Sequence, residues 1–552
     1  MTLASTSTLT IDATTLRTLL VDPGVEIALL DAREAGVHAR DGHILLSVSL
    51  PLSQIELRVA SLVPRRNTRV VVYDADGGPL AARAAQRLRT LGYGDVAILA
   101  GGTASWVEAG YALFTGVNVI GKAFGEYVEH EYGTPHISVA EAKARIDAGD
   151  NVVVIDSRPV AEFRNFSIPG AVDLPGAELV HRFHAAVPDE NTLVVVNCAG
   201  RTRSIIGAQA LINAGVPNRV VSLANGTMDW LIAGHALDSG RDNLGPAPAG
   251  KALVRAQAAT RRLVEHFGIR RVDRTALRAF EAEAAAERRS LYLLDVRTTE
   301  EFERGHLPGS RSAPGGQLVQ QSGDWVGTQR ARIVLIDEPD GVRAAITASW
   351  LIQINQAEVY VLTDALEGPL AVGPEQSLLA APIPAVETID ATSLATRLQA
   401  RDVTLLDLGS SVAYEKAHIP GALFVIRSRL VEDAASLPGD GALVLTSPDG
   451  LLAAFAAAEL QGATDRPVLV LAGGTAGWTQ AGRPLATGRA AAFHPTEDVA
   501  RSAYLADGDR FAAFRAYLDW ELSLVEQLER DGTTRFRRFP PADATAGFGS
   551  AA

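Results

Sequence analysis

The sequence predicts an α/β protein of four tandem units, each a doubly wound parallel sheet with helices on both faces, followed by a helical C-terminal tail. Three observations lead to this prediction. A short apolar phrase ending in Asp recurs four times, a second apolar run follows each copy, and a Gly-Thr-x-x-Trp phrase closes three of the copies. Self-similarity at a fixed spacing is the mark of repeated structural units.

The first two features read as strands. The first phrase occurs as LLDAR at 29–33, VIDSR at 154–158, LLDVR at 293–297 and LLDLG at 405–409, and the later runs are RVVVYD, LVVVNC, RIVLID and ALVLTS. These runs are short, β-branched and continuous rather than alternating, as in buried parallel strands. Strands that alternate with helical stretches at this spacing indicate right-handed βαβ units.

Domain boundaries are placed between the closing phrase of one unit and the opening strand of the next. The predicted units are 1–118, 119–245, 246–375 and 376–490, with a tail at 491–552. The first joint reads as a helix ended by Gly133 and Pro135, and the second as a flexible GPAPAG linker followed by a helix around Arg255 to His266. The tail shows a helical apolar pattern that stops at Gly532, formed by Phe511, Phe514, Leu518, Leu522, Val525 and Leu528.

Length and composition exclude several classes of protein. A chain of 552 residues is too long for one core. The net charge of −13 argues against nucleic-acid and anionic-membrane partners, and neither a signal sequence nor an apolar run long enough for a bilayer is visible. We therefore expect a cytoplasmic protein, with a homodimer left open. Its single cysteine excludes a disulfide framework and a CxxC redox centre.

The chemistry is concentrated in unit two, where an apolar strand runs directly into Cys198. The loop continues as Ala199, Gly200, Arg201, Thr202 and Arg203 before a helical pattern begins. The carboxyl ends of parallel strands are where open α/β sheets hold ligands, so we expect Cys198 to be reachable. The loop N–H groups, the following helix and the two arginines should favour a thiolate and attract an anionic sulfur donor.

These motifs together resemble a rhodanese domain. The resemblance rests on Asp156 to Arg158, the Glu162-Phe163 pair, the turn at 168–171, the cysteine loop and the Gly226-Thr227…Trp230 close, and it extends over four tandem copies. It implies a doubly wound domain of five parallel strands and a catalytic cysteine that accepts sulfur and passes it to cyanide or a thiol. By this resemblance Cys198 carries the persulfide, residues 199–203 form its anion cradle, and Asp156, Arg158 and Glu162 brace the loops.

The other three units depart from this pattern. Asp74, Asp337 and Ser447 stand where unit two has Cys198, and none of them can carry a persulfide. Ser167 replaces the histidine that precedes the turn in the other units, so that histidine is not needed for unit two's chemistry. We expect the three units to pack around unit two, with recognition of a protein donor or acceptor as the alternative.

The sequence thus predicts a thiosulfate sulfurtransferase that works through a Cys198 persulfide, with a small-molecule donor, a thiol or cyanide acceptor and no cofactor. A 3-mercaptopyruvate sulfurtransferase and a cysteine phosphatase fit less well. Phosphatase chemistry places five residues between cysteine and arginine, and four separate Cys198 from Arg203. A non-enzymatic scaffold, or a redox or persulfide sensor, is the rival from another class.

Metal binding is not expected. His181 and His184 could face a common direction, but acidic or cysteine ligands are missing from their surroundings in the sequence. We expect these histidines to line the entrance of the site or to face solvent.

Overall fold

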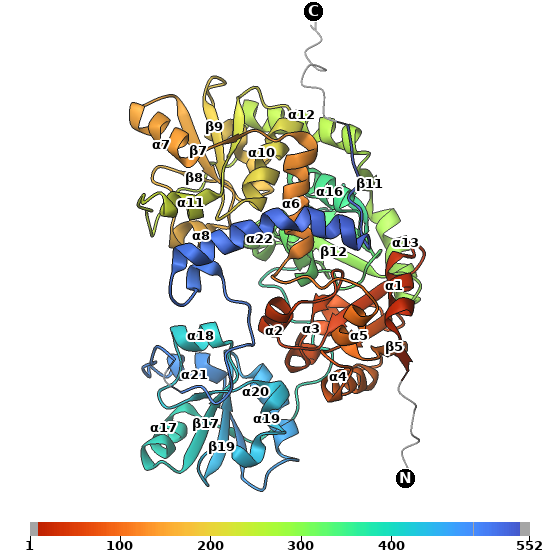
Figure 1. Cartoon of the computed structure of the whole chain (residues 1–552), viewed down its shortest axis with the longest axis vertical. Coiled ribbons are helices and arrows are strands. Elements are labelled where there is room, and N and C mark those ends of the chain that lie inside the picture. Colours follow the sequence, from red (N-terminus) through yellow and green to blue (C-terminus); the bar gives the residue numbers. More distant parts are fainter. Residues whose placement is uncertain (1–8, 490, 541–552) are drawn as a thin grey trace, which may run out of the picture.

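The computed structural model describes residues 9–489 and 491–540 and shows four α/β units (Figure 1). Each unit holds a five-stranded sheet in which all pairs of strands are parallel. The strand order in unit 2 is β6-β10-β9-β7-β8, and the other three units repeat it. The predicted fold class is therefore confirmed.

The elements of the first two units follow the same succession. Unit 1 comprises β1 (Thr10–Ile11), α1 (Ala13–Val21), β2 (Ile27–Asp31), α2 (Ala35–Asp41), β3 (Val48–Ser49), α3 (Ile55–Leu62), β4 (Arg69–Tyr73), α4 (Pro79–Thr90), β5 (Val96–Leu99) and α5 (Gly102–Glu108). The linker helix α6 (Val119–Tyr132) leads to unit 2. Unit 2 comprises β6 (His136–Ile137), α7 (Val139–Ala148), β7 (Val152–Asp156), α8 (Val160–Asn165), β8 (Val172–Asp173), α9 (Glu178–Ala186), β9 (Leu193–Asn197), α10 (Thr202–Ala214), β10 (Val220–Leu223) and α11 (Gly226–Ile232).

A second linker helix, α12 (Gly250–Phe267), leads to the last two units. Unit 3 comprises β11 (Arg270–Val272), α13 (Arg274–Ala285), β12 (Leu291–Asp295), α14 (Thr299–Arg304), β13 (Arg311–Ser312), α15 (Gly315–Gln320), β14 (Arg332–Ile336), α16 (Val342–Ile354) and β15 (Glu358–Leu362). Unit 4 comprises β16 (Thr388–Ile389), α17 (Ala391–Ala400), β17 (Val403–Asp407), α18 (Ser411–Lys416), β18 (Leu423–Phe424), α19 (Arg427–Leu430), β19 (Ala442–Thr446), α20 (Leu451–Leu460), β20 (Val468–Leu471) and α21 (Gly474–Gln480). The tail contains a short 3₁₀ turn, η4 (Ala503–Leu505), and the long helix α22 (Arg510–Asp531).

The central strands are apolar because both faces of each sheet are covered. In unit 2, β7 pairs with β9 from Val152 opposite Leu193 to Asp156 opposite Asn197. Alternate residues enter two different cores: Val154 and Val195 face one, and neighbouring strand residues face the other. Burial on both faces explains why the strand sequences run without polar alternation.

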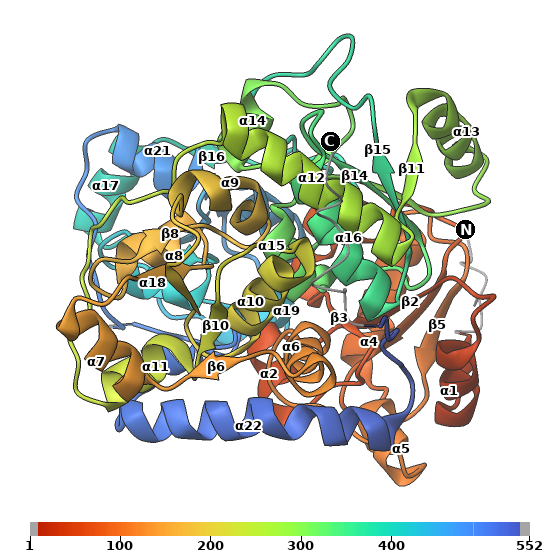
Figure 2. The same cartoon turned by 90° about the horizontal axis from the view of Figure 1, so that it is seen from above.

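Units 2 and 3 share one hydrophobic core. Helix α12 lies between α9 of unit 2 and α16 of unit 3 (Figure 2), and buried residues of both units belong to the same cluster. Gly176 and Gly316 bring the two backbones together, since a Cβ atom on Gly176 would lie 2.4 Å from the Gly316 Cα atom. A common core of this kind makes the two units one structural body.

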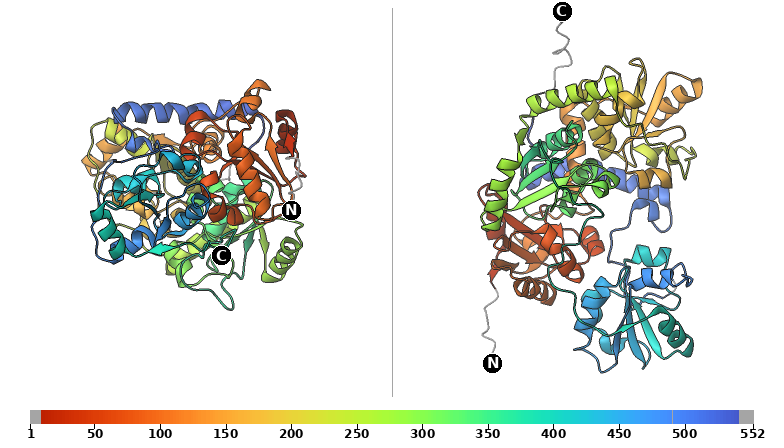
Figure 3. Two further views of the ribbon diagram at one scale, coloured as in Figure 1. Left: turned by 90° about the horizontal axis from the view of Figure 1, so that it is seen from below. Right: turned by 180° about the vertical axis from the view of Figure 1, so that it is seen from behind.

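Units 1 and 4 are joined mainly by charged groups, and Figure 3 shows them side by side. The buried Arg427 of unit 4 donates to the Glu56 carboxylate of unit 1 at 2.7 Å and to Glu459 at 2.8 Å. Arg87 of unit 1 pairs with the same two carboxylates. The second pair of units therefore depends on a buried ionic cluster more than on a shared apolar core.

The linkers and the tail largely follow the sequence predictions. Helix α6 ends at Gly133, which adopts a left-handed conformation (φ 61°), α12 contains the predicted 255–266 segment, and α22 stops at Gly532. The predicted apolar face of α22 is wrong in part. Phe511 and Leu522 are exposed, while Glu521 is buried. The predicted tail extends to residue 552, past the described residues, which end at 540. The exact domain limits stay a prediction.

Among the residues that the structure describes, every helix is too short or too polar to cross a membrane.

We predict that removing Arg427 weakens the contact between units 1 and 4. Arg427→Ala leaves the buried Glu56 carboxylate without its main partner, which costs about 3–5 kcal/mol of stability. The matched control Arg83→Ala breaks an exposed pair with Glu432 across the same contact, and its effect stays below about 1 kcal/mol. Urea unfolding followed by fluorescence checks both values. Equal shifts in the two variants would contradict the role given to the buried cluster.

Candidate active site

Cys198 lies at the carboxyl end of β9, one short loop before α10, as the sequence predicted. Its thiol is 3.5 Å from the Ser204 Oγ atom, and Ser204 in turn donates to the Arg201 carbonyl at 2.8 Å. The expectation that Cys198 is reachable is wrong for this conformation, because only 2% of the residue is exposed.

The loop after Cys198 presents unpaired backbone N–H groups. In the described part of the protein, the N–H groups of Ala199 to Ser204 donate to no protein acceptor. At the matching loop of unit 1, the Asp74 carboxylate accepts hydrogen bonds from the N–H groups of Asp76, Gly77, Gly78 and Ala81 at 2.6–3.2 Å. The loop of unit 1 therefore forms a cradle for negative charge that a side chain fills, and the corresponding loop of unit 2 leaves its N–H groups without a partner among the described residues.

A close approach of the backbone explains the Gly-Thr phrase. Gly226 has φ 56°, and a Cβ atom there would lie 2.3 Å from the Cys198 carbonyl oxygen. The next residue, Thr227, donates its N–H group to that oxygen at 2.9 Å. Gly226 and Thr227 thus hold the cysteine loop through the Cys198 carbonyl group, and only glycine fits at position 226.

Both arginines of the cysteine loop pair with carboxylates of the protein. Arg201 donates to Glu126 at 2.8 Å, also pairs with Glu129 on α6, and bonds the Asn225 side chain. Arg203 forms a two-point pair with Glu162 at 2.8 and 2.9 Å. Burial opposes both guanidinium charges, yet these carboxylates raise the pKa of each arginine. Carboxylates therefore compensate both cations: Glu162, which the sequence analysis placed beside the loops, and Glu126 and Glu129 of α6, which it missed.

Asp156, Arg158 and Glu162 lie behind the loop. The Arg158 guanidinium donates to both Asp156 oxygens, and both side chains are fully buried. The Asn197 amide, one residue before the cysteine, donates to the same Asp156 carboxylate at 3.1 Å. This network connects β7 to the end of β9, and Glu162 reaches the loop itself through Arg203.

A group of tail residues covers the loop, and we call it the tail cover: Tyr504, Phe514, Tyr517, Leu518 and Glu521. Helix α22 crosses α11 and α6 along one side of the molecule (Figure 2). A Cβ atom on Gly200 would lie 3.2–3.8 Å from Glu521, Tyr517 and Leu518. The Tyr504 hydroxyl hydrogen-bonds to Thr227 at 2.7 Å and donates to the Ala199 carbonyl at 3.3 Å.

The buried Glu521 is the charged member of the tail cover. Its Oε1 atom accepts from Lys122 of α6 at 2.9 Å, from Tyr517 at 2.7 Å and from Thr202 of the loop at 3.2 Å. Its Oε2 atom is buried without a partner among the described residues. The sequence analysis missed Lys122 and Glu521, since these side chains are 399 positions apart and neither belongs to a motif.

The two histidines of α9 have different surroundings. His181 is buried between units 2 and 3, where it contacts Glu178 at 3.4 Å and Asp340 at 3.2 Å. Burial opposes protonation, yet these carboxylates raise the pKa of His181 to about 9. His184 is half-buried against Phe183, so the prediction is wrong for His181 alone. Over the described ranges, no cluster of three or more His, Cys, Asp or Glu side chains could hold a metal ion.

Comparison with known proteins agrees with this geometry. A family model described as a rhodanese-like domain matches residues 12–109, 138–233, 279–368 and 390–481. The crystal structure of a thiosulfate sulfurtransferase from Pseudomonas aeruginosa is 44% identical, covers 96% of this chain and 100% of its own, and superposes with a TM-score of 0.90. The chain belongs to the rhodanese family. It is an enzyme of the rhodanese type.

Curated relatives match smaller parts of the chain. The 3-mercaptopyruvate sulfurtransferase of Escherichia coli K12 is 26% identical over 246 residues, which cover 35% of this chain and 85% of that protein. An HTH-type transcriptional regulator of Mycobacterium tuberculosis is 32% identical over 110 residues, which cover 20% of this chain and 47% of the regulator. The chain spans about half the length of the first curated relatives that it matches.

We predict that opening the tail cover speeds alkylation of Cys198. Tyr517→Ala removes a ring that lies against Gly200, so iodoacetamide should label the thiol several-fold faster than in the wild type. Because Cys198 is the single cysteine, intact mass reports on this residue alone. Phe511→Ala, an exposed residue of the same helix, is the control and should leave the rate unchanged. Equal rates in all three proteins would show that the tail does not limit access.

Proposed function

We propose that this protein is a sulfurtransferase that moves a sulfane sulfur through a persulfide on Cys198. The observation that carries the proposal is the comparison of two loops within one chain. In unit 1 the loop amides bind the Asp74 carboxylate, and in unit 2 the amides of the corresponding loop, Ala199 to Ser204, have no acceptor among the described residues. Amides that bind a carboxylate also stabilise a thiolate and, after sulfur transfer, a persulfide anion.

The proposed reaction is a double displacement. The Cys198 thiolate attacks the outer sulfur of the donor, the sulfur–sulfur bond of the donor breaks, and the leaving group takes the electron pair. With thiosulfate the leaving group is sulfite. A thiol or cyanide then attacks the outer sulfur of the persulfide and regenerates the thiolate. The acceptor must come from outside, since the chain has no second cysteine to resolve the persulfide.

Thiosulfate is the donor that we propose first, because the full-length relative from Pseudomonas aeruginosa is a thiosulfate sulfurtransferase. The pairing of Arg201 and Arg203 with carboxylates shifts anion binding onto the loop amides and away from the guanidinium groups. The tail cover must also move aside for a donor to reach the sulfur, given the burial of Cys198. Mercaptopyruvate and glutathione persulfide are the alternative donors.

The decisive measurement is the intact mass of the protein with thiosulfate and then with cyanide. The wild type should gain the mass of one sulfur atom and lose it when cyanide is added, and Cys198→Ser should show no gain. Mercaptopyruvate and glutathione persulfide are tested in the same way. A protein that gains no sulfur from any of the three donors would favour the scaffold or sensor function.

A second prediction tests the amide cradle without any substrate. Cys198→Asp should be inactive, like Cys198→Ser. It should be more stable than the serine variant by about 1–3 kcal/mol, because the carboxylate can accept hydrogen bonds from the loop amides as Asp74 does. Thermal unfolding of the two variants provides the comparison. If the aspartate variant is the less stable of the two, the loop amides do not converge on a negative charge.

A further inference from the structure

The Lys122 ammonium and the Glu521 carboxylate form a buried ion pair beside the cysteine loop. Only 4% of Lys122 and 1% of Glu521 are exposed. Lys122 belongs to α6 and Glu521 to α22, and Figure 1 shows these two helices crossing. Each charge of such a pair depends on the other, because a single buried charge has neither water nor a partner to stabilise it.

One face of α6 lies against the cysteine loop. A Cβ atom on Gly125 would lie 2.9 Å from the Thr202 Cα atom, and the next residue, Glu126, pairs with Arg201. Lys122 lies four positions before Glu126. Residues at this spacing share one face of a helix, so Lys122 is placed on the face of α6 that meets the loop.

Glu521 puts a negative charge directly on the loop. Its Oε1 atom accepts hydrogen bonds from the Lys122 ammonium at 2.9 Å, the Tyr517 hydroxyl at 2.7 Å and the Thr202 hydroxyl at 3.2 Å. Its Oε2 atom would lie 3.2 Å from a Cβ atom on Gly200. A carboxylate of the tail therefore occupies an anion site made of one lysine, one tyrosine and the loop itself.

Opening the tail cover leaves Lys122 without its partners. In the described part of the protein, both hydrogen-bond partners of its ammonium, Glu521 and Tyr517, belong to α22. The two loop arginines keep their carboxylates, which lie on α6 and α8. Because the sulfur is buried while the tail is closed, a donor that reaches it meets an unpaired ammonium beside the loop.

We propose that Glu521 is an internal anion that keeps the sulfurtransferase site closed, and that an anionic donor displaces it and binds Lys122. This inference rests on the proposed function. The oxyanion group of the donor, the sulfonate of thiosulfate, takes the place of the carboxylate on Lys122 and Thr202, and the outer sulfur faces Cys198. The closed form competes with the donor, so the apparent donor affinity falls with the fraction of open protein.

Isothermal titration calorimetry with thiosulfate tests the proposal in the full-length Cys198→Ser protein, which cannot accept sulfur. Adding Glu521→Gln should lower the Kd at least fivefold, because the closed form then leaves the ammonium without a counter-ion. Adding Lys122→Gln as well removes both charges of the pair, and the gain in affinity should disappear. Asp519→Asn, an exposed residue of the same helix, is the matched control and should leave the Kd unchanged.

Three results of this titration would overturn the proposal. The first is an unchanged Kd when Glu521→Gln is added, and the second is an equal gain in affinity with and without Lys122→Gln. The third is the absence of saturation in every variant up to about 50 mM thiosulfate.

The single variants in the protein that retains Cys198 separate opening of the tail from binding of the anion. Glu521→Gln and Lys122→Gln each leave a buried charge without its partner, so both should speed alkylation by the uncharged iodoacetamide several-fold. At subsaturating thiosulfate, sulfur uptake followed by intact mass should be faster than in the wild type for Glu521→Gln and slower for Lys122→Gln. Equal uptake in the two variants would show that Lys122 does not bind the donor. A wild type that takes up no sulfur from thiosulfate contradicts the proposed donor instead, while the calorimetry still decides on the anion site.

Discussion

Backbone amides at the end of a central strand need hydrogen-bond acceptors, and the four units place different residues beside them. Asp74 fills the loop of unit 1 with four hydrogen bonds, and Asp337 of unit 3 accepts from its own loop and from Arg343. Ser447 of unit 4 accepts a single N–H group at 3.3 Å. In unit 2 the corresponding residue is Cys198. The strand-loop-helix arrangement is thus common to the repeats, and the residue at one position of it differs from unit to unit.

The other units and the tail complete the surroundings of this sulfur. Glu126 and Glu129 reach Arg201 from the linker helix, and Lys122 of the same helix meets Glu521 of the tail. Unit 3 contributes Gln317 beside Arg203. Unit 2 alone provides Cys198 and its loop, whereas distant segments cover that loop and contribute charged groups around it.

Local patterns in the sequence predicted the strands, the linker helices and the place of Cys198, because each depends on residues close in the chain. The partners of Arg201 could not be predicted in this way, since Glu126 lies 75 positions from Arg201 and its helix read only as a linker. The buried face of α22 was misplaced for a similar reason. A periodic pattern identifies a face of apolar residues, but the buried face of α22 also includes the charged Glu521, which lies against the cysteine loop.

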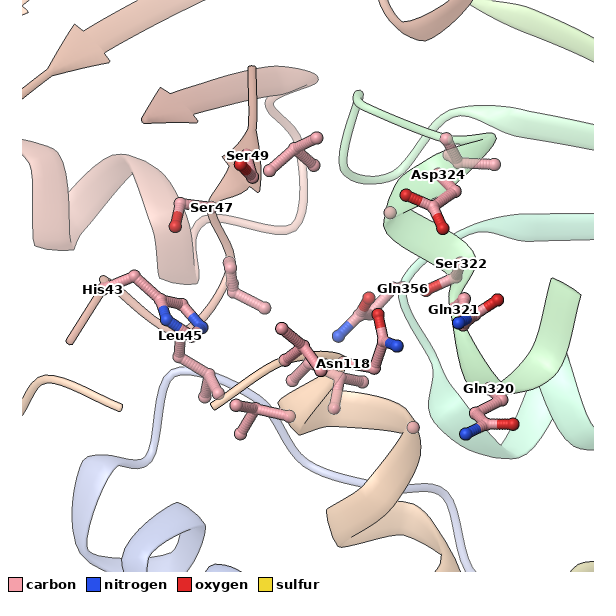
Figure 4. A pocket seen from close by; sticks show the side chains of 18 of the residues that line it. His43, Leu45, Ser47, Ser49, Asn118, Gln320, Gln321, Ser322, Asp324 and Gln356 are labelled. Atoms are coloured by element: carbon pink, nitrogen blue, oxygen red, sulfur yellow. The ribbon is translucent and has the colours of Figure 1, made fainter. Parts of the chain in front are cut away.

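Local sequence patterns also could not predict which units contact each other. Nothing near Arg427 indicates that it is buried against Glu56, 371 positions earlier. A cavity between units 1 and 3, lined in part by His43, Asn118 and Gln320 (Figure 4), has the same origin, because its walls come from distant segments that meet only in the folded chain.

The position of the tail cover has a consequence for biosynthesis. A ribosome makes Cys198 more than 300 residues before Tyr504 and Glu521, and domains fold as they emerge. The cysteine loop of the newborn second unit is therefore without its tail cover while the later units are still being translated. Closure comes last, so any modification that the sulfur acquires during translation is carried under the tail into the finished molecule.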